Sequence, residues 1–483
     1  MTNSETAAMD TAEAGAGSSR SWWLLFAVAA ATFLPALGFY YVGEEAIFPI
    51  SALEMWFHGE PVKRLLFGAD LQHTPLFAWL IIPPASLFGW DAMLVVARGI
   101  TITATLLTAA VVAWLAQALY GDRIFSAVAA VVYLTLADLF FYRGWLAYVD
   151  PLFGLLVFSA IACLWLACER RRYSLLALAV VLLYGAFMAK ALTAYVFYAG
   201  AGLVLLFRTD YRRFLLTLPA LALHAAGAAL LAGWLMIFAS NRAQGSRMFS
   251  EILAKLAPES IGSYLTKLVA YPLETLLCLA PAGLIALWLA VRRRSASPLA
   301  ADAALKTAAW IALVNYLPYW LAPNSHVRYL LPLYPLAGLV IARMLWLGGP
   351  QLLRLTRRWL IGAIVLKLIV VTVVFPLYQA RYRGTNYAEA AQVIRDRTQG
   401  HALYTSNVSA SGLSVAAHID VARLPQPPLT FPPAQWTDGF VIAYQPDPQL
   451  GEVAAQYRLG GNDLYLLCRG AACAAQPAAG PVK

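Results

Sequence analysis

Charged residues are scarce in this chain: Asp, Glu, Lys and Arg make up only 12% of its 483 residues, while 61% are hydrophobic. An ordinary soluble domain carries roughly 25% charged residues, so the composition excludes a soluble globular protein. Apolar runs of about 20 residues, the length that crosses roughly 30 Å of hydrocarbon, recur through the first three quarters of the chain. We therefore predict an α-helical polytopic membrane protein.

About eleven transmembrane helices are predicted from these runs. They lie near residues 22–41, 93–118, 123–142, 148–167, 174–190, 192–207, 214–239, 270–291, 303–321, 328–347 and 359–378. No cleavable signal precedes them, because the first run is too long for a signal peptide and lacks a convincing cleavage site. We interpret it as a retained anchor, and no internal repeat is visible.

The net charge of +10 comes from basic residues in short connectors between the predicted spans. These are Arg170–Arg172, Arg208 with Arg212 and Arg213, Arg292–Arg294, and Arg354 with Arg357 and Arg358. Lys and Arg in short loops mark the cytoplasmic side of a membrane. We therefore predict a cytoplasmic tail at residues 1–21, outward-facing intervening loops and no nucleic-acid partner. Length and the outer tail favour a bacterial inner membrane.

The predicted transmembrane domain covers residues 22–379 and includes an outer loop at residues 42–91. This loop begins with the adjacent acids Glu44 and Glu45, directly after the first span. It also contains the apolar segment Pro75–Phe88, which is short and broken by two prolines. We interpret that segment as an interfacial or re-entrant piece covered by protein, with a genuine short span as the alternative.

Residues 380–483 have the composition of a small α/β domain on the outer (periplasmic) side. Residues 386–398 and 451–459 are predicted as helices, and residues 401–406, 439–445 and 463–468 as strands. Two of the five cysteines, Cys468 and Cys473, lie here. An oxidising outer compartment permits a disulfide between them, although the sequence alone does not decide it.

Several short motifs lie one after another on the predicted outer side. They are Glu44-Glu45, the run 50–60 (ISALEMWFHGE), the run 73–79 (HTPLFAW), Asp150-Pro151, Lys190 and the run 328–332 (RYLLP). Their order, spacing and sidedness resemble the GT-C glycosyltransferase superfamily. The similarity is to the branch with the protein O-mannosyltransferases and the aminoarabinose transferases of lipid A. Glu44 stands where that branch usually has Asp, and His73 where it has Lys.

This resemblance implies transfer of a sugar from a polyprenyl-phosphate donor to an acceptor hydroxyl on the outer face, with inversion at the anomeric carbon. The acceptor could be lipid A, another glycolipid or a protein. The implied catalytic acids are Glu44 or Glu45, which would orient or deprotonate the acceptor, and Asp150. The implied donor-phosphate residues are His73, Lys190, Arg247, Arg328 and Tyr329.

The resemblance leaves metal use open. A divalent metal ion bridging the phosphate is compatible with outer carboxylates, but the sequence shows no closed ligand set.

The main alternative is a transporter or flippase for lipid-linked sugars. Such proteins tend to have inverted repeats, interrupted helices and ionisable groups at mid-membrane. Here the acids lie at helix exits and no repeat is seen, which favours the transferase. A non-catalytic scaffold and a polymerase or ligase that uses diphosphate-linked donors are further alternatives.

Overall fold

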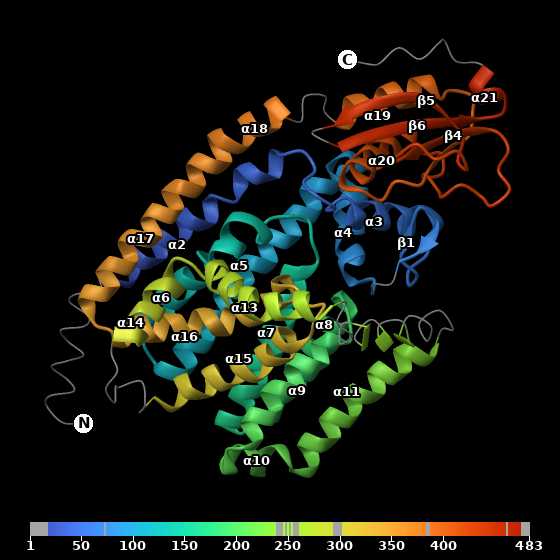
Figure 1. The fold of residues 1–483 in the computed structure, drawn as a ribbon. Helices are drawn as coiled ribbons and strands as arrows, with labels where there is room; N and C mark the ends of the chain where they lie inside the picture. Colours follow the sequence, from blue (N-terminus) through green and yellow to red (C-terminus); the bar gives the residue numbers. More distant parts are fainter. Residues whose placement is uncertain are drawn as a thin grey trace, which may run out of the picture. The chain divides into compact units, whose positions relative to one another are not determined.

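The computed structural model describes most of the chain (Figure 1). The described residues are 18–71, 74–237, 245–246, 249–250, 253–254, 260–292, 302–382, 387–459 and 462–474. They form two compact units. The first contains the described residues within Met1–Leu34, Thr101–Trp145 and Val149–Leu368, and the second those within Pro35–Ile100, Leu146–Tyr148 and Ile369–Lys483.

The first unit is helical. Its α-helices are α2 (Ser19–Ala31), the larger part of α5 (Met93–Tyr120), α6 (Arg123–Leu134), α7 (Asp150–Arg170), α8 (Tyr173–Ala189), α9 (Thr193–Leu206), α10 (Thr209–Leu215), α11 (Leu218–Ile237), α13 (Ile261–Cys278), α14 (Ala282–Arg292), α15 (Ala303–Leu321), α16 (Tyr334–Leu347) and α17 (Pro350–Ile369). A π-helical turn, η3 (Leu139–Arg143), precedes α7, and a 3₁₀ turn, η5 (Val327–Leu333), precedes α16.

Helix α7 forms the centre of this unit. Between Asp150 and the closing Glu169 and Arg170 it is apolar on nearly all sides, and a helix of that kind is stable when it is surrounded by other apolar elements. It packs against α8, α9, α10 and η5. Pro151 at the start of α7 suits its position, because the first helical residues have no intrahelical acceptor for their N–H groups. The helix therefore holds Asp150 at a fixed point at its N-terminal end.

The described residues contain six helices that are long and apolar enough to cross a membrane. They are Ser19–Gly38, Trp90–Tyr120, Asp150–Arg170, Leu218–Ile237, Val327–Leu347 and Pro350–Arg381. Four shorter apolar helices lie at Leu76–Phe88, Arg123–Leu134, Tyr173–Ala189 and Thr193–Leu206. Most predicted spans thus coincide with a helix.

The predicted span at residues 270–291 is interrupted, as either a broken span or a re-entrant loop. Helices α13 and α14 meet there at a bend of 114°. Pro281 explains the break, because proline has no N–H for the helical ladder and disfavours helical geometry at the preceding residue. The carbonyl of Ala280 instead accepts a hydrogen bond of 2.9 Å from the N–H of Ala137.

The second unit combines the predicted outer loop with the C-terminal region. It contains η1 (Leu34–Gly38) from Pro35 onward, α3 (Ile47–His58), β1 (Leu65–Leu66), β2 (Ala69–Asp70), α4 (Leu76–Phe88), η2 (Trp90–Ala92), the start of α5, η6 (Val370–Val374), α18 (Phe375–Tyr382), α19 (Tyr387–Arg397), β3 (Leu403–Thr405), α20 (Ala410–Arg423), β4 (Gly439–Ala443), β5 (Glu452–Leu459), β6 (Asn462–Arg469) and α21 (Ala471–Ala474). Helix α4, at 13 residues, spans about 20 Å, less than the hydrocarbon thickness. Its interfacial placement stays a prediction.

Residue Glu54 of α3 anchors the β1–β2 hairpin. Its carboxylate accepts hydrogen bonds from the N–H groups of Phe67 (2.6 Å) and Gly68 (3.0 Å). Burial nevertheless raises the pKa of Glu54 to about 7, against the effect of these two hydrogen bonds. The same hairpin contacts the C-terminal region, where the N–H of Phe431 donates to the carbonyl of Phe67 at 2.9 Å.

The C-terminal region is built on a four-stranded sheet with the order β3-β4-β6-β5. Strands β3 and β4 are parallel, whereas β6 pairs antiparallel with both β4 and β5. Helices α19 and α20 pack together, and α20 also contacts β6 (Figure 1). This confirms a small α/β region after the helical part.

The predicted helix at residues 451–459 is wrong, since these residues form β5. Ala455, Tyr457 and Leu459 are buried, and Arg458 between them is exposed, which is the alternation of a half-buried strand. A bulge between Val453 and Ala455 interrupts the alternation, which concealed the pattern in the sequence. Pairing with β6 overrides the helical propensity of the Glu, Ala and Gln residues.

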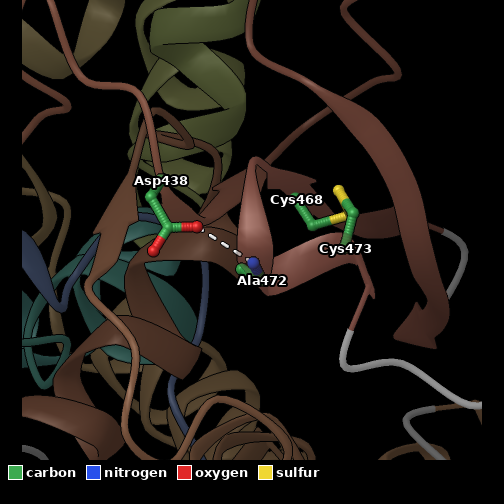
Figure 2. Close-up of a disulfide and its surroundings, with 4 residues drawn as sticks. All are labelled: Asp438, Cys468, Ala472 and Cys473. Carbon is green, nitrogen blue, oxygen red and sulfur yellow. Dashed lines mark hydrogen bonds between the residues drawn. A yellow bond between two sulfur atoms is a disulfide. The ribbon is translucent and has the colours of Figure 1, made fainter.

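Cys468 and Cys473 form a disulfide at the end of β6, as Figure 2 shows. The bond closes the turn that joins β6 to the short helix α21. The carboxylate of Asp438 accepts a hydrogen bond of 2.9 Å from the N–H of Ala472 in that helix. These contacts attach the end of the described chain to the sheet.

Candidate functional site

The structure separates the two adjacent acids, Glu44 and Glu45. Glu45 is fully buried and forms an ion pair with Arg98 of α5. Its Oε1 accepts from the N–H of Val42 (2.7 Å) and from Nη2 of Arg98. Its Oε2 accepts from Nε of Arg98 (3.2 Å) and from the N–H of Ala147 (2.9 Å). The Glu45 carboxylate is therefore fully engaged within the protein.

Arg98 holds the chain that leads to the acids. Besides its two bonds to Glu45, it donates from Nη1 to the carbonyls of Ala36 (2.8 Å) and Phe39 (2.6 Å), and from Nη2 to that of Tyr40 (2.9 Å). All five N–H groups of its guanidinium are thus used. The buried charge stabilises an irregular segment by donating hydrogen bonds to its carbonyls.

Glu44, in contrast, is exposed. Its backbone N–H donates to the hydroxyl of Tyr148 at 3.2 Å. The preceding Gly43 has a φ of +60°, and a Cβ there would lie 2.9 Å from the same hydroxyl, so glycine suits this turn. Gly43 and Tyr148 thereby present the Glu44 side chain to solvent, while Glu45 points inward.

A second cluster lies in the first unit, around the start of α7. The carboxylate of Asp150 pairs with Nζ of Lys190, which directly follows α8. The two side chains are 16% and 17% exposed, so the pair is accessible at its edge only. Nζ of Lys190 also lies 5.7 Å from the ring centre of Phe153 and 5.6 Å from that of Tyr329.

A second ion pair supports the Asp150 pair. Nε of Arg143, in the π-helical turn η3, bonds both carboxylate oxygens of Asp138 at 2.9 and 3.1 Å. The hydroxyl of Tyr334 donates to Asp138 at 2.8 Å. Arg143 and Arg328 also lie within electrostatic range of Asp150. These charges favour an anionic Asp150 held in one place.

The exposed Arg328 and the half-buried Tyr329 form the accessible part of this cluster. The guanidinium of Arg328 lies 5.1 Å from the ring centre of Tyr329 and donates to its hydroxyl at 3.2 Å. Two carboxylates, Asp138 and Asp150, face three cations, Arg143, Lys190 and Arg328. The cluster therefore carries a net charge of +1, and its exposed member is Arg328. Such an arrangement can bind a phosphate group.

The structure thus brings the site candidates Asp150, Lys190, Arg328 and Tyr329 together in one unit. His73 and Arg247 lie outside the described residues. Among the residues that are described, no three His, Cys, Asp or Glu side chains gather in a way that could hold a metal ion. Asp138 and Asp150 are each paired with a cation instead. Metal use, which the sequence leaves open, stays open.

Sequence reasoning missed four residues that shape the two clusters: Arg98, Asp138, Arg143 and Tyr334. The sequence did contain a sign of the three charged residues, because they lie inside or next to predicted spans. Arg98 lies inside the predicted span 93–118, and Asp138 lies inside 123–142, with Arg143 just after it. Ionisable residues within apolar spans are costly and usually paired, so they point to partners inside the protein.

Comparison with protein-family models and with curated protein sequences finds no match. The fold, however, matches solved structures of ArnT from Cupriavidus metallidurans. The structure bound to undecaprenyl phosphate matches with a TM-score of 0.64 and 15% identity, covering 96% of this chain and 100% of that one. The structure in the apo state matches with a TM-score of 0.63 and 16% identity over the same shares. The chain therefore has the polytopic membrane fold of ArnT, and the predicted fold class is confirmed.

Proposed function

We propose that this protein is a membrane glycosyltransferase that moves a sugar from a polyprenyl-phosphate donor to a hydroxyl of an envelope acceptor. The observation that carries the proposal is the positively charged cluster of Asp150, Lys190, Arg328 and Tyr329. It occurs in a fold shared with a protein whose structure holds undecaprenyl phosphate. A cluster with one cation in excess suits the phosphate that such a donor releases.

Arg328 and Lys190 are the proposed donor-phosphate residues. Arg328 is exposed and can contact two phosphate oxygens at once, because its N–H groups form a planar fork. Tyr329 orients that guanidinium through its ring and its hydroxyl. Asp150 keeps Lys190 in place by the ion pair. As negative charge develops on the leaving phosphate, Arg328 and Lys190 stabilise it.

Glu44 is the proposed base for the acceptor. The acceptor oxygen attacks the anomeric carbon, the bond from that carbon to the phosphate oxygen breaks, and the electron pair leaves on the polyprenyl phosphate. The acceptor's proton passes to Glu44, whose carboxylate is exposed. A single displacement inverts the anomeric configuration. Glu45 has the separate role of holding the loop, since its oxygens already accept from Arg98 and two backbone N–H groups.

The proposal includes the membrane arrangement inferred from the basic connectors. The N-terminus lies in the cytoplasm, and residues 380–483 lie in the periplasm of a bacterial inner membrane. The transfer then takes place on the outer face, where lipid A, another glycolipid or a protein hydroxyl is the acceptor. The disulfide between Cys468 and Cys473 supports an oxidising compartment for this end of the chain.

The test uses purified protein in native envelope lipids with radiolabelled polyprenyl-phosphate sugars. We expect label to move to a lipid or protein acceptor with the wild type and to be lost in Glu44→Gln and Arg328→Gln. Glu60→Gln is the matched control, because Glu60 is an exposed acid in the same segment. Parallel reactions with EDTA measure metal dependence. If no donor is consumed and lipid-linked sugar instead crosses proteoliposomes equally well in all variants, the protein is a flippase.

A further inference from the structure

A groove of about 650 Å³ lies in the first unit between helices α9 and α15, which pack against each other (Figure 1). Its volume falls in the range of small-molecule sites, roughly 300–1,000 Å³. Most of its lining is apolar and includes Val204 of α9, Phe207 directly after that helix, and Trp310 and Val314 of α15. Phe207 and Trp310 are 83% and 56% exposed, so the groove opens onto the surface of the helical unit.

One end of the groove carries two cations. Arg208, which precedes α10, and Lys306, in the first turn of α15, line this end, and both are exposed. Among the described residues, neither side chain forms an ion pair, and no Asp or Glu belongs to the lining. This end of the groove is therefore suited to an anion.

The two acids closest to these cations in the sequence do not neutralise them. Asp302 precedes α15, where its Oδ1 accepts from the N–H of Leu305 at 2.8 Å and its Oδ2 from Nε of Arg343 at 2.7 Å. Asp210 follows Arg208 by two residues but lies outside the lining. The positive charge at the end of the groove is therefore free to attract a ligand.

Two contacts hold Arg208 in place at this end. Its guanidinium lies 4.4 Å from the ring centre of Tyr211. Its Nη1 donates to the hydroxyl of Thr307 at 3.5 Å, and Thr307 is a buried residue of the groove lining. A guanidinium has five N–H groups, and in the described part of the chain this contact uses one of them. Arg208 is thus fixed in position with N–H groups still available for phosphate oxygens.

The length of the groove matches one leaflet of a membrane. From Lys306 to Val314 it follows eight residues of α15, or about 12 Å at a rise of 1.5 Å per residue. The hydrocarbon core of a bilayer is roughly 30 Å thick, so one leaflet contributes roughly 15 Å. Arg208 belongs to one of the basic connectors, which place the charged end at the headgroups. The apolar end then lies among the acyl chains.

We propose that this groove binds an anionic glycerophospholipid, such as phosphatidylglycerol, from the leaflet on the side of the basic connectors. The phosphate contacts Arg208 and Lys306, and an acyl chain packs along Trp310 to Val314. Phosphatidylethanolamine would bring an ammonium group close to two cations and therefore binds less tightly. The site is independent of the proposed transferase function, because it shares no residue with the cluster around Asp150. A lipid that binds only the folded protein across α9 and α15 stabilises it.

The test measures lipid binding to the full-length, delipidated protein in detergent by native mass spectrometry. The probes are dioleoyl phosphatidylglycerol and dioleoyl phosphatidylethanolamine, which have the same acyl chains. We expect phosphatidylglycerol to bind about tenfold more tightly. Arg208→Gln and Lys306→Gln should each weaken its binding about fivefold, the contribution of one cation near an anionic lipid surface. The double variant should bind both lipids equally. Arg213→Gln is the control, since Arg213 is an exposed cation of the same connector outside the lining.

A further variant tests the apolar part of the groove. Val314→Trp fills its inner end, so it should weaken binding of dioleoyl phosphatidylglycerol severalfold. Dihexanoyl phosphatidylglycerol, whose chains are too short to reach Val314, should bind this variant as it binds the wild type. Phosphatidylglycerol should also raise the unfolding temperature of the wild type but not that of the double variant with Arg208→Gln and Lys306→Gln.

Three results would overturn the proposal. The first is equal binding of phosphatidylglycerol and phosphatidylethanolamine by the wild type. The second is an unchanged preference for phosphatidylglycerol in the double variant, or an equal loss in Arg213→Gln. The third is displacement of phosphatidylglycerol by inorganic phosphate or by undecaprenyl phosphate at lower concentrations than unlabelled phosphatidylglycerol requires, because the occupant is then a free anion or the donor lipid.

Discussion

Glu44 and Glu45 should respond differently when each is changed to glutamine: the change at Glu45 should lower stability, and the change at Glu44 should lower turnover. In Glu45→Gln, an amide offers one acceptor oxygen where the carboxylate offers two, and its NH₂ group is itself a donor. Whichever way the amide turns, two donors among Arg98 Nη2, Arg98 Nε, Val42 N and Ala147 N lose their acceptor. At about 1–3 kcal/mol each, the loss is roughly 2–6 kcal/mol.

An independent argument leads to the same magnitude. Arg98 has no exposed surface, so Glu45→Gln leaves its charge buried without a counter-ion. Breaking a buried ion pair in this way costs about 3–5 kcal/mol. Glu44→Gln, by contrast, alters an exposed side chain and should change stability by less than about 0.5 kcal/mol. Its effect should fall on turnover instead, because a lost general base lowers the rate by about 10²–10⁴-fold.

The assay pairs thermal unfolding in detergent with label transfer from the polyprenyl-phosphate donor. Glu45→Gln should unfold several degrees below the wild type. Glu44→Gln should unfold at the same temperature as the wild type but transfer little label. A double-mutant cycle with Arg98→Met should give a coupling of about 1–3 kcal/mol between Glu45 and Arg98. If Glu45→Gln keeps its unfolding temperature while losing transfer, and Glu44→Gln keeps both, the assignment of the two acids is refuted.

Three further variants test other parts of the structure. Arg328→Gln should slow transfer and weaken binding of the donor about tenfold or more, and Arg328→Lys should recover only part of the affinity, because an ammonium cannot contact two phosphate oxygens as a fork. Equal affinities of the variants and the wild type in competition binding with polyprenyl phosphate would argue against phosphate contact. Asp150→Asn should destabilise the protein by about 1–3 kcal/mol, because it leaves Lys190 without its ion-pair partner. Adding Lys190→Met should restore part of that stability. If the unfolding shifts of the two single variants simply add in the double variant, the two residues are not coupled. Glu54 binds a proton more tightly in the folded state, so its contribution to stability, at most about 3 kcal/mol, is present below pH 4.5 and is lost as the pH rises to about 7. The unfolding temperature should therefore fall less steeply between pH 5 and 8 in Glu54→Gln than in the wild type. Parallel curves for the two proteins would contradict the raised pKa.

The helices were predictable from the sequence because each depends on a continuous run of apolar residues. Apolar runs of about 20 residues locate most helices, including Asp150–Arg170 and Met93–Tyr120. The structure departs from the predicted elements where one residue changes the local backbone. Pro281 breaks the predicted span at residues 270–291, and a bulge beside Ala455 hides the strand at Glu452–Leu459.

The sequence allowed the candidate site residues to be named, but it did not show which of them pair with one another. Asp150 and Lys190 are 40 residues apart, and Glu45 and Arg98 are 53 apart, so nothing in the local pattern shows that they pair. Which of Glu44 and Glu45 is buried also depends on distant groups, namely Arg98 and the N–H of Ala147. Sequence periodicity cannot assign that difference to adjacent residues in an irregular segment.

The hydrogen bond between Phe67 and Phe431 has a consequence for how the chain is made. The second unit takes its residues from Pro35–Ile100, Leu146–Tyr148 and Ile369–Lys483, so its parts leave the ribosome far apart in time. At roughly 5–20 residues per second, Phe431 follows Phe67 by roughly 20–70 s. During that interval the β1–β2 hairpin exists without the loop that covers it, although Glu45 can already meet Arg98 and Ala147. Ribosome stalling or truncation between residues 368 and 431 would therefore yield a chain with its helical unit complete and its hairpin uncovered, a ready target for membrane proteases.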